Sequence, residues 1–144
     1  IILCFDILEN LFDRPKTLNS LIQKKYLDKK DLIIVADPNV DDVTPYCIQY
    51  FVDTRNIALQ DENLYLMCFH PGSPATVEEH AFLADNDWDS SKVEPYMMIF
   101  MQELKLLQDA SSQLKRQGYY KNWPMDYYNE VVTPRQKLKP NIRR

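Results

Sequence analysis

Three short, continuous apolar runs constrain the fold of this chain more than any other feature. They span residues 1–5, 31–36 and 63–69, and each ends at a polar or turn-forming residue. Segments with helical spacing of apolar residues separate them, at 17–26 and 45–53. Buried strands that alternate with helices are typical of crossover units in a parallel sheet. We therefore predict an α/β fold, a Rossmann-like three-layer sandwich with a small, mainly parallel sheet.

Two further segments have helical signals. Thr76 and Glu79 have the spacing of a capping box, which predicts a short helix through Ala84. From Pro95 to Gln117, apolar residues recur at helical spacing, and a glycine follows where a helix would end. This spacing predicts one long C-terminal helix, with a stripe formed by Met97, Phe100, Met101, Leu104, Leu107 and Leu114.

The composition changes after Gly118. Five aromatic residues fall within ten positions, and a basic run interrupted by prolines follows them. Residues 119–144 hold six Lys or Arg against two acids, whereas residues 1–118 hold eleven against nineteen. We therefore predict an α/β domain at 1–118 and an aromatic and basic extension at 119–144 that packs on the domain or on a partner.

The composition also excludes several classes of protein. No stretch approaches the roughly 20 apolar residues that cross a bilayer, so we expect no membrane association. Only two glycines occur, and neither phosphate-binding glycine motif can be written with them. Three widely spaced cysteines and the lack of a signal peptide indicate an intracellular protein, nuclear or cytoplasmic.

Carboxylates are concentrated in the middle of the chain. Eleven acids and one cation lie between Asp37 and Asp89. In an open parallel sheet, ligands bind beyond the carboxyl ends of the strands, where Asp6 and Asp37 are expected. Together with Asp87 in a later loop, these two residues form a hypothetical site for Mg²⁺ or Mn²⁺, of the kind that supports phosphodiester hydrolysis. The alternative is that the acids cap helices and keep loops soluble, with no cofactor bound.

The run Ile2-Leu3-Cys4-Phe5-Asp6 resembles the start of PIN-type nuclease domains, in which an aspartate ends the first strand. Ile7 and Leu8 follow Asp6, in place of the Thr or Ser and Asn or Ser that continue the motif in that family. The resemblance implies a metal-dependent nuclease or phosphoesterase, or a degenerate form of one that is retained to bind RNA or protein.

Cys68 and His70 alternate along the third run and would point to one face of a strand, with His80 ten residues further on. This pattern suggests a thiol nucleophile or a structural zinc site. The alternative is a buried, reduced cysteine, because free cysteines are among the most buried residues.

Aromatic and methionine residues at the C-terminal end favour an interaction role. We predict a non-catalytic scaffold domain of a larger intracellular assembly, which binds a protein partner through Tyr96, Met97, Phe100, Met101, Tyr119, Tyr120, Trp123, Tyr127 and Tyr128. Nucleic acid is the alternative ligand of the tail, because stacking rings next to cations hold single strands. The cations in this alternative are Arg135, Lys137, Lys139, Arg143 and Arg144.

Overall fold

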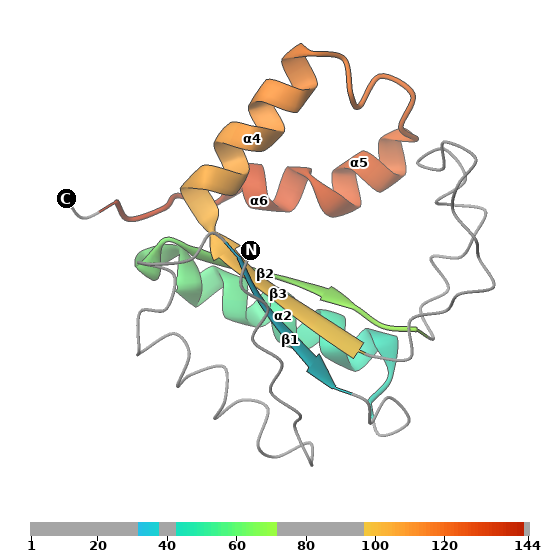
Figure 1. Ribbon diagram of the computed structural model, residues 1–144, viewed down its shortest axis with the longest axis vertical. Coiled ribbons are helices and arrows are strands. Elements are labelled where there is room, and N and C mark those ends of the chain that lie inside the picture. The colour runs from blue at the N-terminus through green and yellow to red at the C-terminus, as the bar shows by residue number, and fades with distance from the viewer. Residues whose placement is uncertain (1–31, 38–42, 72–96, 143–144) are drawn as a thin grey trace.

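The computed structural model describes residues 32–37, 43–71 and 97–142 of the chain (Figure 1). The predicted elements at 1–5, 17–26 and 76–84 lie outside these ranges. The described elements, in chain order, are β1 (Leu32–Asp37), α2 (Pro45–Leu59), the 3-10 helix η2 (Gln60–Glu62), β2 (Leu64–Phe69), β3 (Met97–Glu103), α4 (Leu104–Arg116), α5 (Met125–Val131) and α6 (Thr133–Lys137). Within these ranges, no helix is long and apolar enough to cross a membrane.

The sheet is antiparallel, so the prediction of a mainly parallel, Rossmann-like sandwich is wrong. Its described strands are ordered β1-β3-β2, and β3 pairs antiparallel with both neighbours. Met101 lies opposite Ile33 on one side and Leu66 on the other. β1 and β2 therefore run in the same direction, as their link through α2 suggests, but β3 lies between them and replaces the expected parallel pairing. The α/β content was predicted correctly.

The long helix predicted from Pro95 to Gln117 is wrong in its first part, because residues 97–103 form the central strand. Along β3 buried and half-buried residues alternate, with Met97, Ile99 and Met101 at most 3% exposed. A run in which nearly every residue is apolar satisfies both the helical and the strand period. Pairing with a strand on each side decides between them. The helix begins at Leu104, and Gly118 follows its end as predicted.

Helix α2 covers one face of the sheet (Figure 1). Thr44 caps it, accepting a hydrogen bond from the Cys47 backbone N–H at 3.2 Å, and Pro45 starts it, as the sequence indicates. Ile48 and Val52 pack against the alternate strand residues that point to this side, and these residues form the core.

Asn56 of α2 closes the outer edge of β2. Its side chain donates to the Leu66 carbonyl at 2.9 Å and accepts from the Leu66 N–H at 2.7 Å. Both residues are buried, at 4% and 1% exposed. Leu66 lies opposite Met101 in the ladder, and the two backbone groups that it turns away from β3 are satisfied by a single amide.

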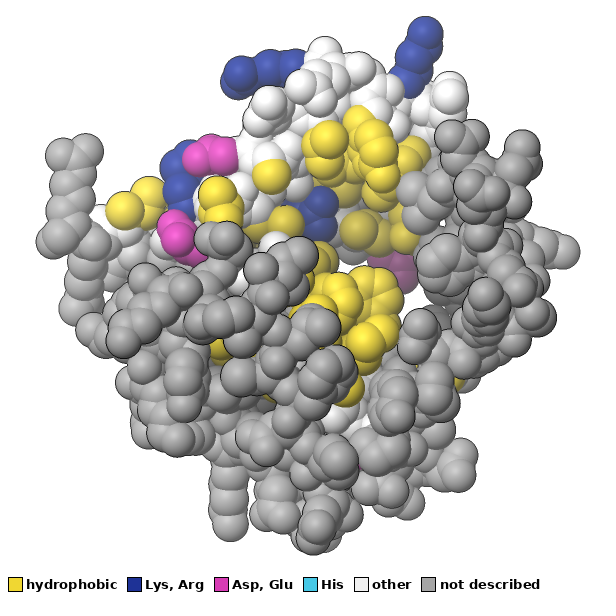
Figure 2. All heavy atoms as spheres, in the orientation of Figure 1, with side chains coloured by type: hydrophobic (Ala, Val, Ile, Leu, Met, Phe, Trp, Pro, Cys, Tyr) yellow, Lys and Arg dark blue, Asp and Glu magenta, His cyan; other side chains and the backbone are white. Residues whose placement is uncertain are grey.

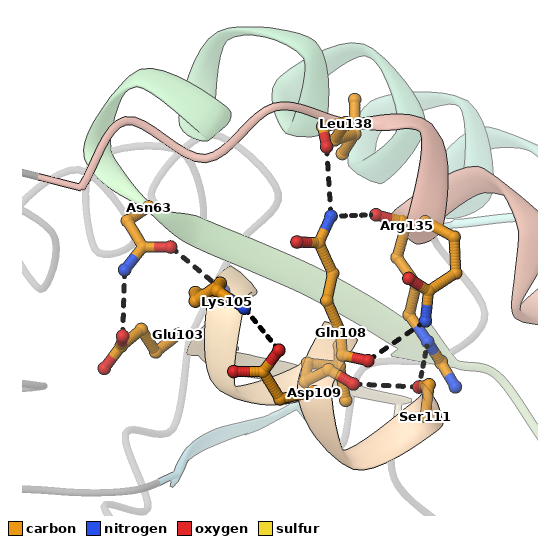
Figure 3. Close-up of polar contacts among 10 residues, drawn as sticks. Asn63, Glu103, Lys105, Gln108, Asp109, Ser111, Arg135 and Leu138 are labelled. Carbon is orange, nitrogen blue, oxygen red and sulfur yellow. Dashed lines mark hydrogen bonds and ion pairs between the residues drawn. The ribbon is translucent and has the colours of Figure 1, made fainter. Parts of the chain in front are cut away.

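Asn63, in the turn between η2 and β2, joins the sheet to a group of three helices. Asn63 has a left-handed backbone conformation (φ 55°), and its side-chain oxygen accepts from the Lys105 N–H at 3.0 Å (Figure 3). Its carbonyl accepts from the Leu104 N–H at 2.9 Å, and its amide donates to Glu103 Oε1. A residue before β2 thereby caps α4, which has no cap from its own Glu103 side chain.

Helices α4, α5 and α6 and the chain after them, residues 104–142, form what we call the helical lobe (Figure 1). Gln108 of α4 donates to the carbonyls of Arg135 and Leu138, at 2.7 and 3.0 Å (Figure 3). Gln60 accepts from the backbone N–H groups of Lys139 and Asn141, both at 2.9 Å. The tail after Gly118 is therefore held against α4 and η2 by hydrogen bonds to its backbone.

Candidate functional site

A sharp turn between α4 and α5 brings the aromatic residues of the tail together. Gly118 has φ 79°, a conformation that other residues rarely adopt, and its N–H donates to the Lys115 carbonyl. The N–H of Tyr119 donates to the Leu114 carbonyl, which completes the C-terminal cap of α4. Pro124 then starts α5, whose first backbone bond runs from the Tyr128 N–H to the Pro124 carbonyl.

Five rings at this turn form one connected cluster, which we call the aromatic corner. Its members are Tyr119, Tyr120, Trp123, Tyr127 and Tyr128. Neighbouring ring centroids are 4.7 to 5.8 Å apart, and three of the five pairs are edge-to-face. Rings in this geometry attract one another beyond the effect of burial, so the cluster is a preformed surface. Figure 2 shows hydrophobic side chains gathered between α4 and α5.

The aromatic corner is open to solvent at its rim. Tyr119 is 53% exposed, and the neighbouring Met125, at the start of α5, is 70% exposed. The other four rings are half-buried. Met125 was not among the predicted binding residues. Its place in the sequence, an apolar residue directly after the proline that precedes a short helix, could have indicated that it is exposed.

The structure separates the predicted partner-binding residues into two groups. The five tail aromatics lie together in the aromatic corner, whereas Met97, Phe100 and Met101 belong to β3. Met97 and Met101 are 2% and 1% exposed, so they form core and do not make the exposed helical stripe that was expected. Phe100 points to the other face of the sheet, where the centre of its ring lies 4.8 Å from the centre of the Phe69 ring. Tyr96 lies outside the described residues.

The basic residues of the tail also differ in their surroundings. Arg135 is only 6% exposed, and its Nε donates to Ser111 Oγ at 3.0 Å. Its Nη1 lies 3.8 Å from the sulfur of Met67, on the face of β2 opposite α2. The nucleic-acid alternative requires a guanidinium at the surface that can contact phosphate, and the guanidinium of Arg135 is buried instead. Lys137 and Lys139 are exposed, and Arg143 and Arg144 lie outside the described residues.

The metal hypothesis finds no support in the described part of the chain. Asp37 ends β1 as predicted and is 2% exposed, while Asp6 and Asp87 lie outside the described ranges. Across residues 32–37, 43–71 and 97–142, no three His, Cys, Asp or Glu side chains are grouped so that they could hold a metal ion. In addition, these acids were expected to meet at one edge of a parallel sheet, whereas β3 pairs antiparallel with both β1 and β2.

Cys68 is a half-buried free thiol on β2. Its sulfur donates to Gln49 Oε1 at 3.3 Å. Burial first, and then the negative charge of Asp53, raise the pKa of the Cys68 thiol from 9.0 to about 12. His70 turns elsewhere, with its Nε2 2.6 Å from the Val43 carbonyl oxygen. A nucleophile needs the thiolate, so this environment disfavours the catalytic interpretation of Cys68.

Comparison with known proteins assigns this chain to no family. No protein-family model matches the chain, and no curated protein or solved structure shows significant similarity to it. Its function is therefore inferred from its own residues and their contacts.

Proposed function

We propose that this chain is a non-catalytic protein-interaction module of an intracellular assembly, nuclear or cytoplasmic, and that the aromatic corner is its binding surface. One observation carries the proposal. Five rings are held in a single cluster at the tip of a helical pair, and one of them, Tyr119, is 53% exposed. Met125, which follows Trp123 and Pro124 in the chain, is 70% exposed. Tyr, Trp and Met are the side chains that protein interfaces prefer at their centres.

The cluster is suited to binding because it is already ordered. The turn is set by Gly118 and Pro124, and the rings restrict one another, so little side-chain freedom remains to be lost when a partner binds. Tyrosine also offers a hydroxyl beside an apolar ring, which allows the rim to hydrogen-bond while the ring faces bury.

A protein partner is favoured over single-stranded nucleic acid by two features of the corner. Bases stack on free ring faces, whereas in this cluster each ring packs against at least one other ring. In addition, the Arg135 guanidinium is buried between α4, α6 and β2 instead of facing solvent.

The test is a comparative affinity purification from extracts of the source cells. The wild type is compared with a Tyr119→Ser, Met125→Ser variant, which removes the exposed apolar rim. A matched control, Tyr46→Ser with Tyr50→Ser, removes two exposed tyrosines that stack on the outer face of α2, 77% and 64% exposed. We expect proteins enriched by the wild type to be lost with the rim variant and retained with the control. Equal retention by both variants would refute the proposal.

A further inference from the structure

Residues of α4, α5 and α6 line an open pocket of about 360 Å³ that shares Tyr128 with the aromatic corner. Two lysines face it, Lys115 from α4 and Lys137 from α6. The rest of the lining consists of Gln136 and four hydroxyl residues, Ser111, Ser112, Tyr128 and Thr133, and no carboxylate is part of it. The hydroxyls of Ser111 and Thr133 already donate to the Leu107 carbonyl and to Asn129 Oδ1, so the pocket presents two lysines and the hydroxyls of Ser112 and Tyr128. This composition suits an anion.

A third cation, Arg135, lies next to the pocket without lining it. Its Nε donates to Ser111 Oγ, and Ser111, which lines the pocket, is itself 2% exposed. Among the described residues no carboxylate pairs with Arg135, whose other side-chain contact is the Met67 sulfur. A guanidinium that is 6% exposed without a counter-charge is unusual, because burial of an unpaired cation is unfavourable. An anion in the adjacent pocket would supply the missing negative charge.

The charge of the whole lobe points in the same direction. Residues 104–142 hold seven Lys or Arg and three acids, a net charge of +4, and Lys105 is already paired with Asp109. The described residues before them, 32–37, 43–71 and 97–103, hold one Arg and five acids, a net charge of −4. The Nζ of Lys115 lies 5.4 Å from the centre of the Tyr128 ring, a cation–π contact that favours its position beside the pocket.

We propose that this pocket binds a phosphate monoester. Two ammonium groups from different helices match the charge of about −1.5 to −2 that a phosphate monoester carries at neutral pH, whereas a carboxylate carries one charge. The same chemistry fits free phosphate and a phosphorylated side chain. Because Tyr128 belongs to both the pocket and the aromatic corner, a phosphorylated residue of a protein partner could occupy both together. The anion site goes beyond the proposed function and does not depend on it.

The experiment is a titration of the full chain with inorganic phosphate and, separately, with O-phosphoserine, followed by amide NMR at constant ionic strength set with chloride. We expect saturable shifts in the amides of α4 and α6 around Ser112 and Lys137. Lys115→Gln with Lys137→Gln should weaken binding about tenfold or more. Lys121→Gln with Lys139→Gln changes the net charge equally on exposed residues outside the pocket lining, and should leave affinity within about twofold.

Tighter binding of O-phosphoserine than of phosphate identifies a phosphorylated side chain as the ligand, and the reverse order identifies the free anion. Shifts that do not saturate, or equal losses in the two lysine pairs, would overturn the site. Because the probe is phosphate alone, the Tyr119→Ser, Met125→Ser variant should bind it as the wild type does. Failure of the anion site and failure of the protein-binding proposal are therefore distinguishable.

Discussion

The side chain of Asn56 forms hydrogen bonds with both backbone groups of Leu66, at 2.9 and 2.7 Å, and so joins α2 to the edge strand β2. Asn56→Ala would leave the buried N–H and C=O of Leu66 without partners. We expect the free energy of unfolding to fall by about 2–4 kcal/mol, measured by urea denaturation. Thr54→Ala, on the exposed side of the same helix, should change it by less than about 0.5 kcal/mol. Equal effects of the two substitutions would contradict this role for Asn56.

Local signals in the sequence predicted several elements of the fold correctly. The runs at 31–36 and 63–69 are β1 and β2, shifted by one residue at most, and Thr44, Pro45 and Gly118 mark helix ends as expected. These signals depend on the chemistry of one or two adjacent residues, such as a side-chain cap or a permitted backbone angle. They do not depend on the rest of the fold.

The arrangement of the strands could not be predicted in the same way. Residues 97–103 are apolar at nearly every position, so only pairing with distant strands shows that Met97, Ile99 and Met101 point to one side. The cap of α4 by Asn63 joins residues that are 42 apart in the sequence. Burial of Arg135 likewise depends on Ser111 and Met67, from two other elements. Of the candidate binding residues, the tail aromatics were identified by their density alone.

Arg135 gives a prediction about stability. A buried guanidinium without a carboxylate partner is costly, so Arg135→Met should keep the packing of the side-chain stem and remove the cost. We expect the free energy of unfolding to be unchanged or raised by up to about 2 kcal/mol in buffer without phosphate. Arg135→Ala, which also removes the stem, should lower it by about 2 kcal/mol. A loss of more than about 2 kcal/mol with methionine would show that the guanidinium itself stabilises the fold.

Cys68 predicts how stability changes in alkaline solution. Burial and Asp53 raise its folded-state pKa to about 12, whereas the unfolded thiol loses its proton near 9.0. Between these pH values the folded state binds more protons than the unfolded state. The contribution of Cys68 to the free energy of unfolding is therefore fully present below about pH 9 and is lost as pH rises toward 12. The free energy of unfolding, measured from pH 8 to 11, should therefore decrease less in Cys68→Ala than in the wild type. Parallel curves would contradict the raised pKa.

The same pKa predicts slow chemistry at this sulfur. At pH 8 the thiolate fraction of Cys68 should be roughly a thousandfold lower than that of a thiol with an ordinary pKa. Cys47 is exposed and provides the comparison. With Cys4→Ser and Cys47→Ser, the remaining Cys68 should react with a disulfide reagent far more slowly than Cys47 does after Cys4→Ser and Cys68→Ser. Similar rates would show that the Cys68 thiol is accessible and ionised.

Within the aromatic corner, the half-buried rings should stabilise the fold, whereas the exposed ring of Tyr119 should matter for binding and little for stability. Tyr120 is half-buried and contacts the rings of Tyr119, Trp123 and Tyr128, so Tyr120→Ala should lower the free energy of unfolding by about 2 kcal/mol. Tyr119→Ser removes a ring that is 53% exposed and should change it by less than about 0.5 kcal/mol. Both values follow from urea denaturation monitored by circular dichroism. Equal losses would mean that the rim of the corner is part of the core.

The central claim is that the aromatic corner contacts a protein partner, and site-specific photo-crosslinking in the source cells tests it most directly. A benzophenone amino acid replaces Tyr119 in one variant and Tyr46 in the other. Both positions are exposed, but only Tyr119 belongs to the corner. We predict a discrete crosslinked protein from position 119 and none from position 46. A crosslink from position 46 alone, or from neither position, would contradict the account.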